Sequence, residues 1–324
     1  MKKLLGILAL VLVFTLVACS GEKANQSTEN SDSDDTEKAS NTEDMKIGLA
    51  VNTLNNPFFV DLQDGAEATA EEQGIELVVT DSQGDPGKQM SDVENLLQQG
   101  VDLLILNPVD SDAAGQAALL ANDQGVPVIT VDRQASEGDI VTHVGFNALK
   151  SGGIAAAYLE EALGGEGKVV EIQGILGTNV GQDRSSGFND HMENVEGIEI
   201  IASQSANFDR GEALSVMEDI LQANKEIDAV YAANDEMVMG ALSAIESAGR
   251  LDEIVIIGTD AIDPAIEAIR EGRLNATIAE PPFFLGREAV NAAIKTLNDE
   301  VVDDQITLEN TLVTEDNVDE VKTR

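Results

Sequence analysis

The segment Val126-Pro127-Val128-Ile129-Thr130-Val131-Asp132-Arg133 decides the fold class. A short apolar run ends in an aspartate and an arginine, which is typical of a buried strand that leaves a sheet into a loop. Ile47-Gly48-Leu49-Ala50-Val51 leads in the same way to Asn55-Asn56-Pro57-Phe58-Phe59. Open α/β sheets bind ligands at such strand exits, so both loops are candidate binding segments.

Short apolar runs alternate with helix-like stretches from Met45 onward, a pattern that predicts parallel βαβ units. The predicted strands are 46–51, 76–80, 103–106, 128–131, 169–172, 198–203, 229–232 and 254–258. A helix-like stretch follows each strand, and the helices 59–73, 89–99 and 235–248 end at Gly74, Gly100 and Gly249, which suit left-handed caps. At 324 residues the chain is long enough for two domains. The sequence therefore predicts an α/β protein with two similar halves that divide near residues 146–148.

The first 19 residues resemble a bacterial lipoprotein signal peptide. Lys2 and Lys3 precede an apolar stretch over 4–17, and a small residue stands just before Cys19. The resemblance implies cleavage before Cys19 and a lipid on its thiol; the alternatives are an ordinary secretory signal or a membrane anchor. Residues 20–44 are rich in Ser, Asn, Thr, Glu and Asp and are expected to form a disordered acidic linker.

The chain is strongly acidic, with a formal net charge of −41. Such a field repels phosphate backbones and excludes nucleic acid as a partner. The acidity fits life in high salt or at high pH, or a compositional bias of the lineage, and the sequence does not separate these explanations.

No motif indicates an enzyme, so we expect no catalytic residues. Gly164-Gly165-Glu166-Gly167-Lys168 is followed by valine where a P-loop needs serine or threonine, and a turn is the better interpretation. The only cysteine is Cys19, so the folded body has no disulfide and no thiol nucleophile. His143 and His191 lie in unrelated contexts, which indicates structural or surface roles, and neither a metal nor a cofactor is predicted.

Six segments, taken together, resemble the ribose-binding proteins of ATP-binding-cassette importers, within the type 1 periplasmic binding protein family. They are Thr53-Leu54-Asn55-Asn56-Pro57-Phe58-Phe59, Asp81-Ser82-Gln83, Asn107-Pro108-Val109-Asp110-Ser111-Asp112, Asp132-Arg133-Gln134, Phe208-Asp209-Arg210 and Asn234-Asp235-Glu236-Met237. The resemblance implies two Rossmann-like lobes joined by three hinge crossings. It places the N-terminal lobe at 45–147 plus 281–309 and the C-terminal lobe at 148–280 plus 310–324. It also implies that the lobes close on a monosaccharide and deliver it to a membrane permease.

Ligand-binding residues are implied by the same resemblance. On the first lobe they are Asn56, Phe58, Phe59, Asp132 and Arg133, and on the second Arg184, Phe208, Asn234 and Asp260. The roles are chemically reasonable, because carboxylates accept from sugar hydroxyls, guanidinium groups donate and amides do both. The three phenylalanines can cover the apolar faces of a sugar ring. Taken singly, each residue also has an ordinary explanation: Asp132 and Asn234 as helix caps, Phe58 and Phe59 as core.

Three further positions of the implied site depart from the family pattern. Asn52 stands where serine is common, Thr259 where an aromatic residue is common, and Glu280 where a hinge glutamine is common. Thr259 is expected to remove one wall of the pocket. Glu280 would set three carboxylates against two guanidinium groups, and an unmatched charge in a closed cleft is costly, so we expect it to bind a proton or turn to solvent.

Together, the two resemblances imply a monomeric, lipid-anchored protein that faces outside the cytoplasm and binds D-ribose. The open alternatives are another pentose, a hexose, a furanose signalling molecule, or a sugar sensor that feeds a membrane receptor. The two-lobed transcription repressors of similar architecture need an N-terminal basic helix-turn-helix, and this chain carries an export signal and an acidic segment there.

Overall fold

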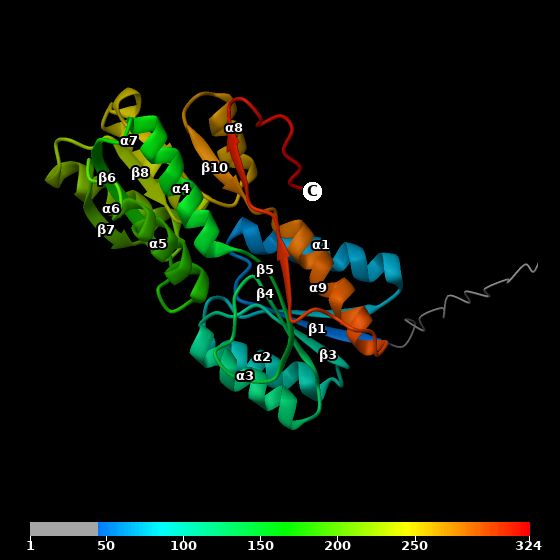
Figure 1. The fold of residues 1–324 in the computed structure, drawn as a ribbon. Helices are drawn as coiled ribbons and strands as arrows, with labels where there is room; N and C mark the ends of the chain where they lie inside the picture. The colour runs from blue at the N-terminus through cyan, green and yellow to red at the C-terminus, as the bar shows by residue number, and fades with distance from the viewer. Residues whose placement is uncertain (1–44) are drawn as a thin grey trace, which may run out of the picture. The chain divides into compact units, whose positions relative to one another are not determined.

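The computed structural model describes residues 45–324 (Figure 1). The predicted signal peptide, the acidic linker and Cys19 lie outside the described residues. No helix within 45–324 combines the length and the apolar composition needed to cross a bilayer.

The first sheet has six strands in the order β11-β5-β4-β3-β1-β2, and all its pairings are parallel. Its strands are β1 (Lys46–Val51), β2 (Glu76–Asp81), β3 (Leu103–Leu106), β4 (Val128–Val131), β5 (Ile140–Phe146) and β11 (Gln305–Leu308). Helices α1 (Pro57–Gln73) and α9 (Pro282–Leu297) pack together on one face, and α2 (Pro86–Gln98) and α3 (Ser111–Asp123) on the other (Figure 1). The central strands are buried on both faces, which explains their continuous apolar sequences.

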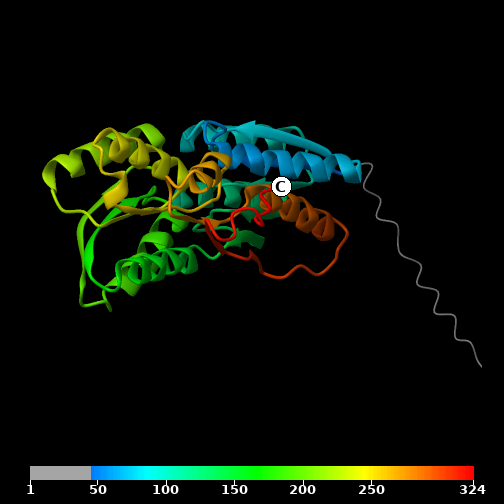
Figure 2. The ribbon, with the colours of Figure 1, turned by 90° about the horizontal axis from the view of Figure 1, so that it is seen from above.

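The second sheet has the order β12-β10-β9-β8-β6-β7, and only β12 runs antiparallel to its neighbour. Its strands are β6 (Gly167–Gln173), β7 (Ile198–Ser205), β8 (Ala229–Ala232), β9 (Val255–Ile257), β10 (Ala276–Ala279) and β12 (Thr311–Thr314). The helices are α4 (Ala148–Leu163), α5 (Asn179–Met192), α6 (Arg210–Ala223), α7 (Asp235–Ser247) and α8 (Asp263–Arg270), with the short 3₁₀ turn η1 (Leu251–Glu253). Helix α4 packs on α5, and α6 packs on α7; Figure 2 shows the two pairs on opposite sides of the strands.

The chain passes between the two sheets three times: from β5 to α4, from β10 to α9, and from β11 to β12. Two parallel-dominated sheets joined by three crossings confirm the predicted fold class. Both sheets belong to one compact unit of the chain.

The helix ends follow the predicted signals, but the connection between β4 and β5 differs from the prediction. Gly74 caps α1 with φ 70°, and Gly100 and Gly249 have φ values of 74° and 67°. The expectation that every predicted strand is followed by a helix is wrong for β4. Residues 132–139 form a loop that leads straight into β5, which the sequence did not predict. This connection leaves Asp132 and Arg133 in a loop, outside any helix.

His143 on β5 has a structural position, as expected. Its side chain is 7% exposed, and its Nδ1 lies 3.0 Å from the Thr130 hydroxyl. Burial lowers the pKa of His143 from 6.5 to about 4. His191 lies at the surface beside Glu160.

We expect the buried imidazole to make the fold acid-sensitive. The unfolded chain takes up a proton on this residue below pH 6.5 and the folded protein only near pH 4, so the free energy of unfolding should fall by about 3 kcal/mol between those values. Urea denaturation of wild type and His143→Gln at several pH values measures the difference, with His191→Gln as the matched control. Parallel pH profiles for wild type and His143→Gln would show that His143 is not responsible.

Candidate functional site

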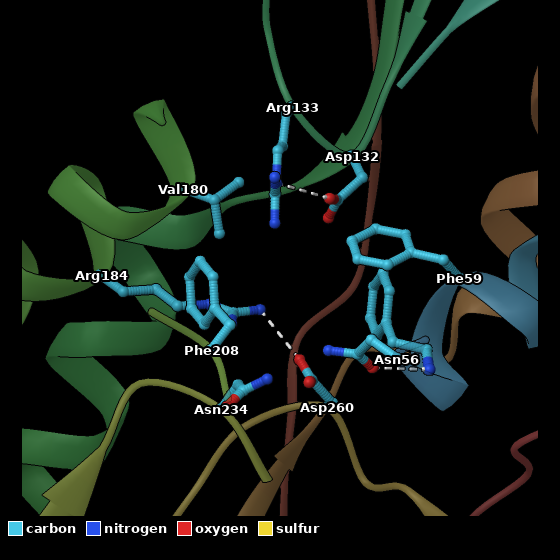
Figure 3. A pocket seen from close by; sticks show the side chains of 10 residues that line it. Asn56, Phe59, Asp132, Arg133, Val180, Arg184, Phe208, Asn234 and Asp260 are labelled. Carbon is cyan, nitrogen blue, oxygen red and sulfur yellow. Dashed lines mark hydrogen bonds and ion pairs between the residues drawn. The ribbon is translucent and has the colours of Figure 1, made fainter. Parts of the chain in front are cut away.

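A small cavity, with about 270 Å³ of space that is partly open to solvent, lies where loops from both sheets meet (Figure 3). It is lined by Asn56, Phe58, Phe59, Asp132, Arg133, Val180, Arg184, Phe208, Asn234 and Asp260. Most of these residues stand just beyond the carboxyl end of a strand, and Val180 and Arg184 lie on α5. The cavity occupies the position at which open α/β sheets bind ligands.

The start of α1 builds one wall. Asn56 caps the helix, because its Oδ1 accepts from the backbone N–H of Phe58 at 2.9 Å, and Pro57 occupies the first helical position. The rings of Phe58 and Phe59 lie edge to face, 5.1 Å apart between centroids, and each side chain is 4% exposed. The helix cap thus fixes the direction in which two aromatic rings enter the cavity.

Asp132 and Arg133, which follow β4, form a second part of the cavity wall on the side of the first sheet. Asp132 has φ 64°, and its backbone N–H donates to the Val144 carbonyl at 2.8 Å, which ties the turn to β5. Nε of Arg133 lies 3.6 Å from Asp132 Oδ2, an ion pair that is too long for a hydrogen bond. Burial raises the pKa of Asp132, whereas Arg133 and Arg184 lower it.

The guanidinium group of Arg133 lies over two aromatic rings. Its carbon lies 5.3 Å from the centroid of Phe59 and 5.6 Å from that of Phe208. Nη1 donates to the carbonyls of Pro108 and Val109 at 3.1 and 3.3 Å. Since Phe59 and Phe208 come from different halves of the fold, Arg133 links the two sides of the cavity.

Arg184 is the central cation of the opposite side. Its Nη1 donates to the Ala233 carbonyl at 2.6 Å, and its Nη2 donates to Asp260 Oδ1 at 3.1 Å and to Glu280 Oε2. Burial lowers the pKa of Arg184, but Glu280 and Asp260 raise it more, so the guanidinium group stays charged.

The loop that carries Asp260 has an unusual backbone. Asp260 and Ala261 have φ values of 121° and 63°. The buried carboxylate of Asp235 supports this loop, because it accepts from the N–H groups of Ala261 and Ile262 at 2.8 and 3.2 Å and from the Thr277 hydroxyl. Asp235 therefore positions Asp260 without lining the cavity itself.

Asn234 caps a helix and also faces the cavity. Its Oδ1 accepts from the backbone N–H of Met237 at 3.0 Å at the start of α7, which leaves the amide nitrogen for other partners. The structural and the ligand-binding interpretations of Asn234 are thus compatible, as they are for Asn56. Phe58 and Phe59 likewise belong to the core and to the cavity wall at once.

Comparison with known proteins identifies the family. A family model described as periplasmic binding protein domain matches residues 47–300. The chain belongs to the periplasmic binding protein family. It is 41% identical over 293 residues to the ribose import binding protein of Bacillus subtilis (strain 168), covering 90% of this chain and 92% of that protein. It is 43% identical over 256 residues to the ribose import binding protein of Escherichia coli (strain K12), covering 79% and 86%.

Solved structures of solute-binding proteins share the fold of this periplasmic binding protein. One from Bacillus halodurans C-125 with bound myo-inositol has a TM-score of 0.82 at 33% identity, covering 86% of this chain and 97% of that one. One from Actinobacillus succinogenes 130z with bound D-allose has a TM-score of 0.81 at 31% identity, covering 86% and 100%. These findings confirm the family resemblance seen in the sequence.

The structure brings nine of the twelve predicted ligand-binding residues of this binding protein together around the cavity. Glu280 lies behind Arg184 and is 2% exposed, so it has not turned to solvent. Thr259 is fully buried next to Asp260, and its carbonyl accepts from the Asp235 N–H at 2.7 Å. Asn52 lines an adjoining cavity of about 970 Å³, part of it open to solvent, which shares Asn56, Phe59, Arg133 and Phe208 with the first.

Two residues that shape the cavity were not predicted. Val180 lines it from the first turn of α5, and only the packing of that helix reveals this role. Gly174 makes room for Phe208, because a Cβ atom at Gly174 would lie 2.1 Å from Cζ of the ring. A glycine after a strand suggests close approach of another group, but the partner is not visible in the sequence.

Gly174→Ala should therefore displace the Phe208 ring and destabilise the second half of the fold by about 1–3 kcal/mol. Gly153→Ala is the matched control: its nearest neighbour outside the helix is 3.8 Å away, and a helical Gly→Ala change is expected to stabilise by about 0.5–1 kcal/mol. Chemical denaturation of both variants gives the comparison. If Gly174→Ala were as stable as Gly153→Ala, the close packing of Phe208 would be refuted.

Proposed function

We propose that this protein captures a monosaccharide, D-ribose first among the candidates, and delivers it to the permease of an ATP-binding-cassette importer. The observation that carries the proposal is the cavity itself. Carboxyl, amide and guanidinium groups from both sheets surround it, together with three phenylalanine rings. A sugar hydroxyl needs donors and acceptors, and the C–H faces of its ring need apolar surface.

The relatives support ribose as the first choice. Those named as ribose import binding proteins are 39–43% identical to this chain over most of its length. Solved structures with the same fold contain D-allose and myo-inositol, so another polyhydroxylated ring is the second candidate.

We infer a binding role and not a catalytic one. None of the ten side chains that line the cavity is a serine, cysteine, lysine, histidine or tyrosine, and both arginines are engaged with carboxyl or carbonyl oxygens. Such a site holds a ligand through many hydrogen bonds. Its two lining carboxyl groups, Asp132 and Asp260, each face an arginine, and no hydroxyl, thiol, amine or imidazole group stands beside them in the lining to serve as a nucleophile.

In the proposed mechanism, the two sheets belong to lobes that open and close about the three crossings, with the lobes at 45–147 plus 281–309 and 148–280 plus 310–324. The closed arrangement has direct contacts between the lobes. The Gln134 N–H donates to Asn179 Oδ1 at 2.8 Å, and the Ser111 N–H donates to the Gly177 carbonyl at 3.1 Å. A ligand that contacts both lobes binds this arrangement better than an open one and shifts the population towards it.

Arg133→Lys tests the site. Lysine keeps a positive charge beside Asp132 but loses the planar group that lies between Phe59 and Phe208, so ribose affinity in calorimetry should fall about 10- to 100-fold. Arg210→Lys, at an exposed ion pair with Glu236, is the control and should bind as wild type. Absence of ribose binding by the wild-type protein, with binding of another monosaccharide in the same assay, would reassign the ligand.

We further propose that the mature protein acts as a monomer tethered outside the cytoplasm through a lipid on Cys19. The support is the basic and apolar N-terminal sequence that ends at this cysteine. Cells that express the full chain should incorporate labelled palmitate into it, and Cys19→Ala should abolish the incorporation. Equal labelling of the two proteins would disprove the anchor.

A further inference from the structure

On the side of the second sheet, two carboxyl groups share one guanidinium group: Asp260 lies in the cavity wall and Glu280 lies behind Arg184. Nη2 of Arg184 donates to both Asp260 and Glu280, and all three side chains are 3% exposed. On the other side Asp132 and Arg133 balance each other. If every group were ionised, the site would carry one uncompensated negative charge away from water. An unpaired buried charge is costly enough that a carboxyl group takes up a proton instead.

The hydrogen bonds decide which carboxyl group is the neutral one. Glu280 is fully supplied with donors: the Ser151 hydroxyl and the Asn310 amide at 2.7 Å reach Oε1, and Arg184 reaches Oε2. Asp260 receives Arg184 on Oδ1 only, and no hydrogen bond from residues 45–324 reaches its Oδ2. Figure 3 shows the Asp260 side chain directed into the cavity, with one oxygen joined to Arg184.

The surroundings of Asp260 also favour the neutral form. Burial raises the pKa of Asp260 well above its ordinary value; Arg184 lowers it, and neighbouring carboxyl groups raise it further. Asp235 is the other acidic group in contact with this loop. Burial raises the pKa of Asp235 to about 7, although the Thr277 hydroxyl and two backbone N–H groups donate to its carboxylate and lower the value, and its side chain does not line the cavity. The charged and titratable groups around the cluster are Arg184, Asp235, Glu280, Asp132, Arg133 and Tyr231.

We propose that Asp260 is a neutral carboxylic acid at pH 7, because it shares its guanidinium partner with Glu280, and that its Oδ2–H donates a hydrogen bond to the ligand. With Asp260 neutral, Asp132 and Glu280 face the two guanidinium groups of Arg133 and Arg184 one to one; Asp235 lies beneath the loop, where backbone N–H groups and Thr277 donate to it, and is not part of this balance. The site therefore selects an uncharged polyol that presents an acceptor oxygen to Asp260. This part of the inference rests on the proposed sugar-binding function, whereas the protonation of Asp260 does not.

Infrared spectroscopy of the ligand-free protein tests the protonation directly. A buried protonated carboxyl group has a C=O stretch that is distinct from that of a carboxylate. Wild type at pH 7 should show this band, and both Asp260→Asn and Glu280→Gln should lose it. No band in wild type, or a band that survives in Asp260→Asn and disappears in Asp235→Asn, would place the proton elsewhere. A band that survives in Glu280→Gln would refute the part assigned to Glu280.

Calorimetry with D-ribose between pH 6 and 10 tests the donor role. The affinity of the wild-type protein for ribose should fall as the pH rises through the pKa of Asp260, and the limiting slope is about tenfold per pH unit. The affinity of Glu280→Gln should change less with pH. A flat wild-type profile alongside the infrared band would refute the donor role. Absence of ribose binding at every pH would instead contradict the proposed function and leave the infrared result to decide the protonation.

Discussion

One buried guanidinium group, that of Arg184, connects the candidate binding cavity to the crossings between the two sheets. It binds Asp260 at the cavity wall and Glu280 behind it. Glu280 in turn accepts from Ser151, which follows the first crossing, and from Asn310, which lies in the third, while Glu280 itself follows β10 at the second. Any movement of the crossings must therefore disturb the partners of Arg184, so the geometry of the crossings is physically coupled to the wall of the cavity.

The position of Arg184 depends on close packing between two helices. A Cβ atom at Gly152 on α4 would lie 2.0 Å from the Arg184 carbonyl oxygen, so only glycine permits this approach. Close contact of α4 and α5 brings Arg184 over the ends of β8 and β9, where Ala233 and Asp260 receive its hydrogen bonds. The close packing of α4 on α5 and the hydrogen bonds of Arg184 thus both depend on a glycine at position 152.

Several residues of the site serve the fold as well. Asn56 and Asn234 cap α1 and α7 through Oδ1 and present the rest of the amide to the cavity. Phe58 and Phe59 pack in the core of the first sheet and also form a wall of the cavity. The structural roles are therefore compatible with the proposed binding roles, because helices that start at strand ends place their first residues at the edge of a parallel sheet where ligands usually bind.

The sequence by itself determined the α/β class, most strands, the glycine caps and the polar loops at the strand exits, because strand burial and helix termination depend on local patterns of residues. It did not reveal β5 directly after β4, the role of Val180, or the space that Gly174 leaves for Phe208. Only the tertiary structure decided that Glu280 lies behind Arg184, that Thr259 is buried beside Asp260, and that Asn52 faces an adjoining cavity. These are contacts between segments far apart in the chain, and such contacts are set by the packing of helices and sheets, which leaves no periodic signal in the sequence.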